Sequence, residues 1–118
     1  MCVIRIKRVY EKPSPDDGIR VLVERLWPRG VSKEKAAVDR WCKEIAPSPE
    51  LRKWYSHDES KWEEFKQRYL KELDGNQLVE RLSALAARGD VTLIIAARDP
   101  ERSSAAVLLG LLEHREGA

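Results

Sequence analysis

The chain of 118 residues is 42% hydrophobic and 36% charged, which supplies one folded core beneath a well-solvated surface and leaves no room for a second domain. Its 22 basic and 20 acidic residues give a formal net charge of +2, and this near balance argues against a general nucleic-acid binder, which carries a marked basic excess. The apolar runs are too short to cross a bilayer, so residues 1–118 are expected to form a single soluble domain with no membrane role.

The first part of the chain predicts two strands separated by a turn. Residues 4–9 and residues 19–26 are rich in β-branched side chains that partly alternate with polar ones, as in a strand. Residues 12–18 are a turn by composition, because proline fixes φ and glycine permits a positive φ. The two strands fit either a hairpin or a crossover to separate positions in the sheet.

The next segment is more ambiguous. Residues 32–37 predict a short helical turn that begins at a serine cap. The apolar residues between positions 38 and 46 fall at helical spacing, which favours a helix, although an extended segment would present Trp41 and Ile45 equally well. Pro47 ends this segment, because the residue before a proline disfavours helical backbone.

Three helices are then expected in succession. The first begins at Ser48, where a capping serine is followed by Pro49 and Glu50, a proline and an acid that suit the first turn of a helix. Asp58 and Asn76 are expected to cap the second and third helices, whose apolar residues each fall on one face. These inward residues are Trp62, Phe65, Tyr69 and Leu73 in the second helix, and Leu78, Leu82, Leu85 and Ala86 in the third.

The chain closes with a buried strand, a tight turn and a buried helix. Residues 91–96 are continuously apolar, which is typical of a central parallel strand covered on both faces. Asp99 and Pro100 repeat the cap-and-proline signature, and predict a helix over residues 101–113 that is apolar nearly all round its second half. The fold class expected is α/β: a small three-layer domain with a mostly parallel or mixed sheet and helices packed on it.

The turn between the last strand and helix is the first candidate site. In open α/β sheets, ligands collect beyond the carboxyl ends of the strands, where the following helix offers free N–H groups. Arg98, Arg102 and the serines at 103 and 104 suit an anion there. Asp99 argues against this, because as a helix cap it would occupy the same N–H groups and repel a phosphate. The alternative interpretation is a well-capped helix with solvated arginines.

The end of the second strand is the other candidate site. Arg25 and Arg29 flank Trp27, and this combination can bind a phosphate or carboxylate bidentately and stack on a planar group. The alternative is that Trp27 is anchored in the core and that Arg25 pairs with a carboxylate. Charge alone does not separate the two interpretations.

His57 stands beside Asp58, an arrangement that suggests a general base, although Asp58 is also needed as a cap and a surface histidine would look the same. Cys42 lies on the apolar side of its segment and is expected to be buried and inert, despite basic neighbours. Two cysteines and two distant histidines have no metal-ligand spacing, and no glycine-rich phosphate loop is present, so neither a metal nor a cofactor is expected. Reduced thiols and the lack of a signal peptide favour the cytoplasm.

A family resemblance rests on sequence blocks spread over nearly the whole chain. The most specific block is Arg-Leu-Trp-Pro-Arg-Gly at residues 25–30. Further blocks are residues 6–10, 13–18, 20–23, 46–48, 51–54, 57–58, 62–65, 69 and 72–73. With these blocks the chain resembles the YeaO-like (DUF488) family, whose members are small bacterial and archaeal α/β proteins.

The resemblance implies a cytoplasmic prokaryotic protein and names no reaction and no agreed catalytic residues. It adds support to a candidate cluster made of Arg25, Trp27, Arg29, His57 and Asp99. It also implies a His-Asn pair at positions where this chain has Arg102 and Ser103.

Three functions follow from these observations, and whether the protein is an enzyme is left open. The first is an enzyme or ligand-binding domain for a small anion bearing phosphate or carboxylate. Its pocket would lie at the strand ends, with His57 handling protons and with substrate contacts from Arg25, Trp27, Arg29, Arg98 and Asp99. The second is an interaction subunit, such as a homo-oligomer, that packs through the apolar C-terminal helix. The third, nucleic-acid binding, is disfavoured by the charge balance.

Overall fold

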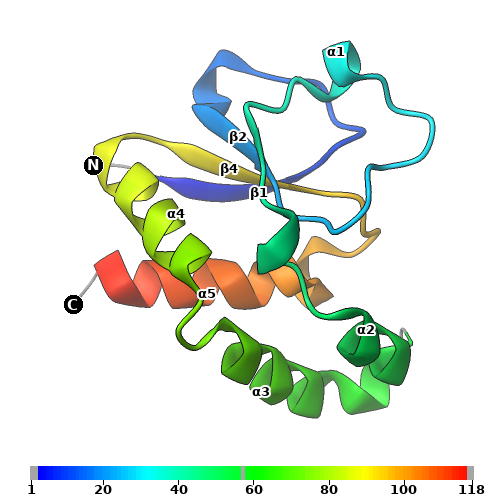
Figure 1. The fold of residues 1–118 in the computed structure, drawn as a ribbon. Helices are drawn as coiled ribbons and strands as arrows, with labels where there is room; N and C mark the ends of the chain where they lie inside the picture. The colour runs from blue at the N-terminus through cyan, green and yellow to red at the C-terminus, as the bar shows by residue number, and fades with distance from the viewer. Residues whose placement is uncertain (1–2, 57, 117–118) are drawn as a thin grey trace.

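A four-stranded parallel sheet forms the centre of the molecule. The structure is a computed structural model, and it describes residues 3–56 and 58–116. The strands are β1 (Ile4–Arg8), β2 (Ile19–Leu22), β3 (Arg40–Trp41) and β4 (Val91–Ile95), and they lie in the order β1-β4-β2-β3 (Figure 1). Because β4 lies between β1 and β2, those two strands are joined by a crossover and not by a hairpin.

Helices cover the two faces of the sheet unequally. On one face α5 (Ser104–Glu116) packs against β1, and it also contacts α3 (Trp62–Leu73) and α4 (Gln77–Arg88) (Figure 1). The seven-residue α2 (Pro49–Tyr55) packs on α3. The other face carries the short α1 (Lys33–Ala36) and the 3₁₀ helix η1 (Pro15–Asp17). The α/β fold expected from the sequence is therefore confirmed, with a fully parallel sheet.

Side chains of β4 alternate between two apolar clusters, one on each face of the sheet. Leu93 and Ile95 belong to the larger cluster, together with the inward residues of α3, α4 and α5. Ile94 belongs to the smaller cluster, on the side of α1. Every residue of β4 is buried, which confirms the prediction of a central strand covered on both faces.

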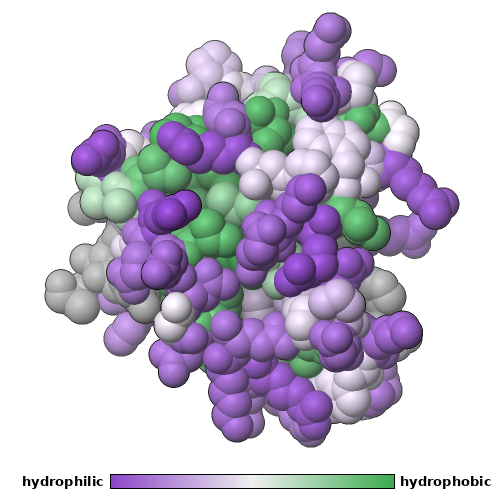
Figure 2. All heavy atoms as spheres, in the orientation of Figure 1, coloured by the Kyte–Doolittle hydropathy of each residue, from purple (hydrophilic) through white to green (hydrophobic). Residues whose placement is uncertain are grey.

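The apolar composition of α5 is explained by packing within the chain. Ala105, Leu108 and Leu112 are buried in the larger cluster, and Leu109 and Leu111 pack against it. The apolar residues of α5 therefore need no partner protein to explain them, and the protein-interaction role suggested by this helix stays a prediction. Hydrophilic side chains predominate on the surface around α3 in Figure 2.

The prediction of a helix across positions 38–46 was wrong. This stretch forms β3 and the 3₁₀ helix η2 (Lys43–Ile45). Ala37 adopts a left-handed conformation, with φ of 49°, and ends α1. Asp39 then exchanges hydrogen bonds with the backbone of Arg20, at 2.8 Å in each direction, which aligns the segment with β2 as a strand. The pairing with β2 outweighs the helical spacing of the apolar residues.

Two boundaries also differ from the prediction. Strand β2 ends at Leu22, four residues before the predicted end at 26. The last helix starts at residue 104, because Asp99 caps only the 3₁₀ helix η4 (Pro100–Arg102) and Ser103 is extended, with φ of −105° and ψ of 163°. The Ser103 hydroxyl accepts the N–H of Ala106 at 3.3 Å and so caps α5.

Within residues 3–56 and 58–116, no helix has both the length and the apolar character needed to cross a membrane. Cys42 is a free, half-buried thiol, and its burial raises its pKa. The expected burial of Cys42 is therefore only partial, and its inertness stays a prediction that the raised pKa favours.

Candidate functional site

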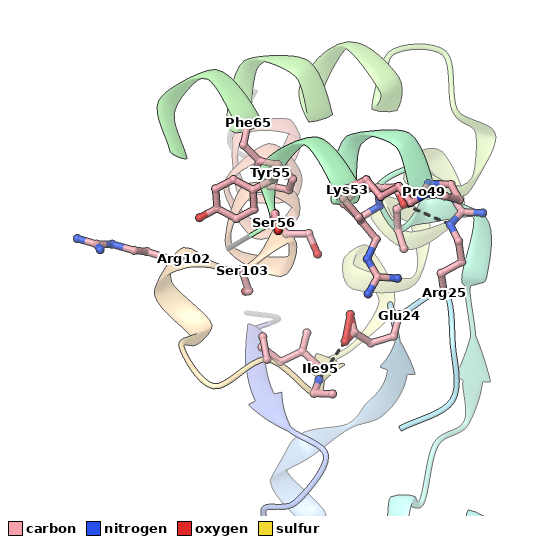
Figure 3. A pocket seen from close by; sticks show the side chains of 16 residues that line it. Glu24, Arg25, Pro49, Lys53, Tyr55, Ser56, Phe65, Ile95, Arg102 and Ser103 are labelled. Atoms are coloured by element: carbon pink, nitrogen blue, oxygen red, sulfur yellow. Dashed lines mark hydrogen bonds between the residues drawn. The ribbon is translucent and has the colours of Figure 1, made fainter. Parts of the chain in front are cut away.

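A pocket of about 650 Å³ opens at the carboxyl ends of β2 and β4. Glu24 and Arg25 reach it just after β2, and residues 95–97 reach it from the end of β4 (Figure 3). Helix α2 and the loop before it form the opposite wall, and residues 102–104, from the end of η4 to the first residue of α5, close one side. The other lining residues are Ala46, Pro47, Pro49, Arg52, Lys53, Tyr55, Ser56, Phe65, Arg102, Ser103 and Ser104.

The carboxylate of Glu24 faces this pocket from the strand side (Figure 3). One of its oxygens, Oε2, accepts a hydrogen bond from the backbone N–H of Ala96 at 3.2 Å, so the side chain bridges the ends of β2 and β4. Burial raises the pKa of the Glu24 carboxyl, while the Ala96 hydrogen bond and the charge of Arg52 oppose the rise. Glu24 is the single carboxylate among the described lining residues.

Arg25 places positive charge in the pocket wall, but its hydrogen-bond donors hold the adjacent loop. Its Nε donates to the carbonyl of Pro47 at 3.2 Å, and Nη2 donates to the carbonyl of Ala46 at 3.0 Å. The same loop is also held by α3. The Glu72 carboxylate accepts one hydrogen bond from the backbone N–H of Ser48 at 2.9 Å and another from the Ser48 hydroxyl at 2.5 Å. Arg25 therefore positions the wall that leads into α2.

Tyr69 fixes the start of this loop from beneath. Its buried hydroxyl donates to the carbonyl of Ile45 at 2.7 Å, and burial strongly raises its pKa. We expect Tyr69→Phe to lower the free energy of unfolding by about 1–2 kcal/mol, because the Ile45 carbonyl loses its partner in a dry site. Urea denaturation followed by circular dichroism measures this loss. Tyr10→Phe, at a tyrosine 54% exposed, is the matched control and should change little.

Two cations from α2 lie exposed at the pocket, and the charge of one of them, Arg52, attracts the Glu24 carboxylate without a direct ion pair. Arg52 and Lys53 line the pocket, and neither side chain makes a hydrogen bond or ion pair with the part of the chain that the structure describes. Arg102 differs from them, because its guanidinium points away from Glu24 (Figure 3) and pairs with Glu59 at 2.7 Å. The free cations are thus on α2, opposite the Glu24 carboxylate.

The remaining wall is aromatic, with one hydroxyl beside it. Tyr55 and Phe65 lie with ring centroids 4.5 Å apart at an angle of 30°. Burial, and then the nearby Glu59, raise the pKa of the Tyr55 hydroxyl, so it stays protonated at neutral pH. Ser56 ends α2 in a left-handed conformation, with φ of 45°, and its hydroxyl faces the hollow (Figure 3).

Of the site residues predicted from the sequence, Arg25, Arg102, Ser103 and Ser104 line the pocket, whereas Trp27, Arg29, Arg98 and Asp99 do not. The indole N–H of Trp27 donates to the carbonyl of Val31 at 2.7 Å, and its half-buried ring packs on the smaller cluster. This matches the alternative interpretation for Trp27, whereas Arg25 donates to carbonyls and not to the carboxylate that this alternative expected. Arg29 and Arg98 are exposed and line no part of the pocket. Asp99 accepts the N–H of Glu101 at 3.0 Å as the cap of η4.

The predicted general base, His57, lies outside the described residues. The contacts of Arg25, Trp27, Arg29, Arg98 and Asp99 with a ligand stay predictions, because the geometry reports only where these residues lie. Both candidate turns do reach one pocket, through residues 24–25 and residues 96–97.

Sequence reasoning missed Glu24, Arg52, Lys53 and Ser56 as site residues. Arg52 and Lys53 belong to α2, whose start was predicted correctly. The sequence did not indicate that the side of α2 that carries these two cations would face the end of β2. That placement depends on the loop that Arg25 and Tyr69 hold. A usable signal was the adjacent pair of cations on a short helix that carries its apolar residues at other positions.

Comparisons with known proteins agree over nearly the full chain. A family model described as the inactive DUF488-N3 subclade matches residues 3–117. The chain is 47% identical over 112 residues to the uncharacterized protein Rv3073c of Mycobacterium tuberculosis, which covers 95% of both chains. It is 42% identical over 106 residues to the uncharacterized protein YeaO of Escherichia coli, which covers 89% of this chain and 92% of that one. No solved structure matches.

Proposed function

The chain belongs to the YeaO-like DUF488 family, in the subclade described as inactive, and on this premise we propose that it binds a small anionic ligand without transforming it. The ligand would occupy the pocket at the carboxyl ends of β2 and β4. The observation that carries the proposal is that the side chains of Arg52 and Lys53 donate no hydrogen bond to any described residue, at a pocket whose described lining contains one carboxylate.

The charge of the lining favours an anion. Arg25, Arg52, Lys53 and Arg102 stand against Glu24 alone, and a concave site lined mostly by one sign of charge concentrates counter-ions. Arg52 and Lys53 are the members of this set with free donors, and both charge types bind phosphate or carboxylate through charge-assisted hydrogen bonds. The first turn of α5, at Ser104, adds the positive end of a 13-residue helix to the same pocket.

Binding without catalysis agrees with two further observations. The matching family model carries the description inactive. The resemblance also implies a His-Asn pair at the positions of Arg102 and Ser103, and both of these residues line the pocket in this chain. Arg102 is held by Glu59, and the Ser103 hydroxyl donates to the carbonyl of Pro100 at 2.7 Å, so both side chains serve local structure. A cytoplasmic location, where Cys42 would stay reduced, fits this proposal.

The proposal predicts that Arg52→Gln weakens anion binding roughly tenfold, because one charge-assisted hydrogen bond is lost. Isothermal titration of the protein with methyl phosphate at low ionic strength measures the dissociation constant. Arg88→Gln is the matched control, because Arg88 is an exposed arginine near the end of α4 that does not line the pocket.

The control variant should bind methyl phosphate as the wild type does, since it removes the same net charge from another surface. Equal affinities of the wild type and Arg52→Gln would show that the anion is held elsewhere. Failure of the wild type to bind any phosphate monoester would contradict the proposed function itself.

A further inference from the structure

Glu24 is out of place in a pocket that binds only an anion. The charge of Arg52 attracts its carboxylate, but no described residue forms a direct ion pair with it, and its hydrogen bond comes from the backbone N–H of Ala96. A bound phosphate that covered Glu24 would desolvate a negative charge and repel it. The second carboxylate oxygen, Oε1, has no hydrogen-bond partner among the described residues and is open to a ligand donor.

We propose that the ligand is a phosphorylated sugar or polyol, whose phosphate lies at Arg52 and Lys53 and whose hydroxyl groups donate to Glu24. This inference rests on the proposed function and assigns the chemical class of its ligand. Glu24 would then be the residue that sets specificity, because a site built to accept a hydroxyl proton rejects an analogue that lacks it.

The size and the walls of the pocket agree with such a ligand. A volume of about 650 Å³ far exceeds a lone phosphate and lies in the ordinary range for small-molecule sites. Neutral hydroxyl groups of the ligand can donate hydrogen bonds to the Glu24 carboxylate, and they bring no further positive charge into a pocket whose lining is already positive. The half-buried Tyr55 ring, backed by the buried Phe65, offers an apolar surface to the C–H face of a sugar, and the Ser56 hydroxyl lies on the same side (Figure 3).

The test compares two probes that share a phosphate monoester and differ in hydroxyl groups: ribose 5-phosphate and methyl phosphate. Wild-type protein should bind ribose 5-phosphate about tenfold more tightly or better, as expected for hydrogen bonds to a charged acceptor. Glu24→Gln should reduce this preference several-fold. The glutamine oxygen still accepts the Ala96 N–H, but a neutral amide is a weaker acceptor of the ligand hydroxyls.

Glu50→Gln is the matched control, since Glu50 is an exposed carboxylate on α2 that does not line the pocket, and it should keep the full preference. A second measurement needs no variant: the NMR signal of the Ala96 amide in wild-type protein should shift with ribose 5-phosphate and stay in place with methyl phosphate. Equal binding of both probes, or an unchanged preference in Glu24→Gln, overturns the inference while the anion site stands. If neither probe binds, the proposed function fails together with it.

Discussion

Replacing Gly18 by alanine is expected to lower the free energy of unfolding by about 4 kcal/mol, among the largest effects of a single methyl group in this protein. Gly18 joins η1 to β2 with φ of 64° and ψ of −137°, a region that L side chains avoid. A Cβ built there would lie 2.2 Å from the carbonyl oxygen of Asp90. That same oxygen accepts the N–H of Ile19 at 3.0 Å, so the backbone cannot move away without losing the first bond between β2 and β4.

Gly30→Ala separates the two contributions to this loss. Gly30 also has a positive φ, of 73°, but an added Cβ would meet nothing within 4 Å. We expect Gly30→Ala to cost about 1 kcal/mol from backbone strain alone. Urea denaturation of both variants at neutral pH measures the difference. Similar losses for the two variants would show that strain, and not contact with Asp90, restricts residue 18.

The elements that the sequence predicted well are those whose signals are local. Ser48 and Asn76 cap α2 and α4 through their own side chains, as expected from residues within one turn, whereas Asp58 caps the 3₁₀ helix η3 (Glu59–Lys61) directly before α3. The uninterrupted apolar run of β4 marked a strand buried on both faces before any topology was known. Capping and burial patterns need no knowledge of the rest of the chain.

The two elements that were predicted wrongly depend on hydrogen bonds that the local sequence pattern does not indicate. The stretch from 38 to 46 became a strand and a 3₁₀ helix because Asp39 pairs with the backbone of Arg20. Helix α5 started late because Ser103, and not Asp99, supplied its cap. In the first case the hydrogen bonds of Asp39 outweighed the apolar spacing, and in the second the Ser103 hydroxyl, and not Asp99, capped the helix.

The position of the candidate site in the fold was predictable from the sequence, but only some of the residues that line it were. Parallel strands bring their carboxyl ends to one edge, so a pocket beyond β2 and β4 was expected, and Arg25 lines it. The wall that carries Arg52 and Lys53 comes from a helix about thirty residues further on in the chain. Its position depends on the Arg25 and Tyr69 hydrogen bonds to backbone carbonyls, which no residue pattern reveals.

Neutralising Asp17 is expected to lower the free energy of unfolding by about 3–5 kcal/mol, because a buried guanidinium would lose its counter-charge. Asp17 is 2% exposed and Arg20 is 4% exposed. The carboxylate accepts from Nη1 of Arg20 at 2.5 Å and from Nζ of Lys7 at 3.1 Å. Its Oδ2, which meets Arg20, also accepts the backbone N–H of Ser14 at 3.0 Å. Its Oδ1 accepts from Lys7, so both oxygens are engaged.

This network organises the second face of the sheet. Arg20 donates from Nη2 to the carbonyl of Ala36 at 2.8 Å and from Nε to that of Ala37 at 3.0 Å, and so attaches α1 to β2. The backbone carbonyl of Asp17 accepts the hydroxyl of Thr92 at 2.7 Å, which attaches η1 to β4. The apolar cluster on this face is small, and the ion network completes the attachment of both short helices to the sheet.

Acid should weaken this network in a defined direction. Burial by itself would raise the pKa of Asp17, but the hydrogen bonds from Ser14, Lys7 and Arg20 outweigh it and lower the pKa below the ordinary value. A lowered pKa in the folded state means that the unfolded chain binds the proton more readily. The stabilisation is therefore complete above the ordinary carboxyl pKa, and it is lost as the pH falls below about 4 toward the folded-state pKa.

Asp17→Asn tests both the size of the effect and its pH dependence. Urea denaturation at neutral pH should show the full loss, and the difference from wild type should shrink as the pH is lowered from about 4 to 2. Asp16→Asn is the matched control, because Asp16 is the exposed neighbour whose carboxylate has no hydrogen bond in the described chain, and it should cost less than about 0.5 kcal/mol. A loss for Asp17→Asn that stays constant across this pH range would mean that shape, and not charge, secures η1. A loss as small as that of Asp16→Asn would mean that Arg20 keeps its position through Ala36 and Ala37 alone.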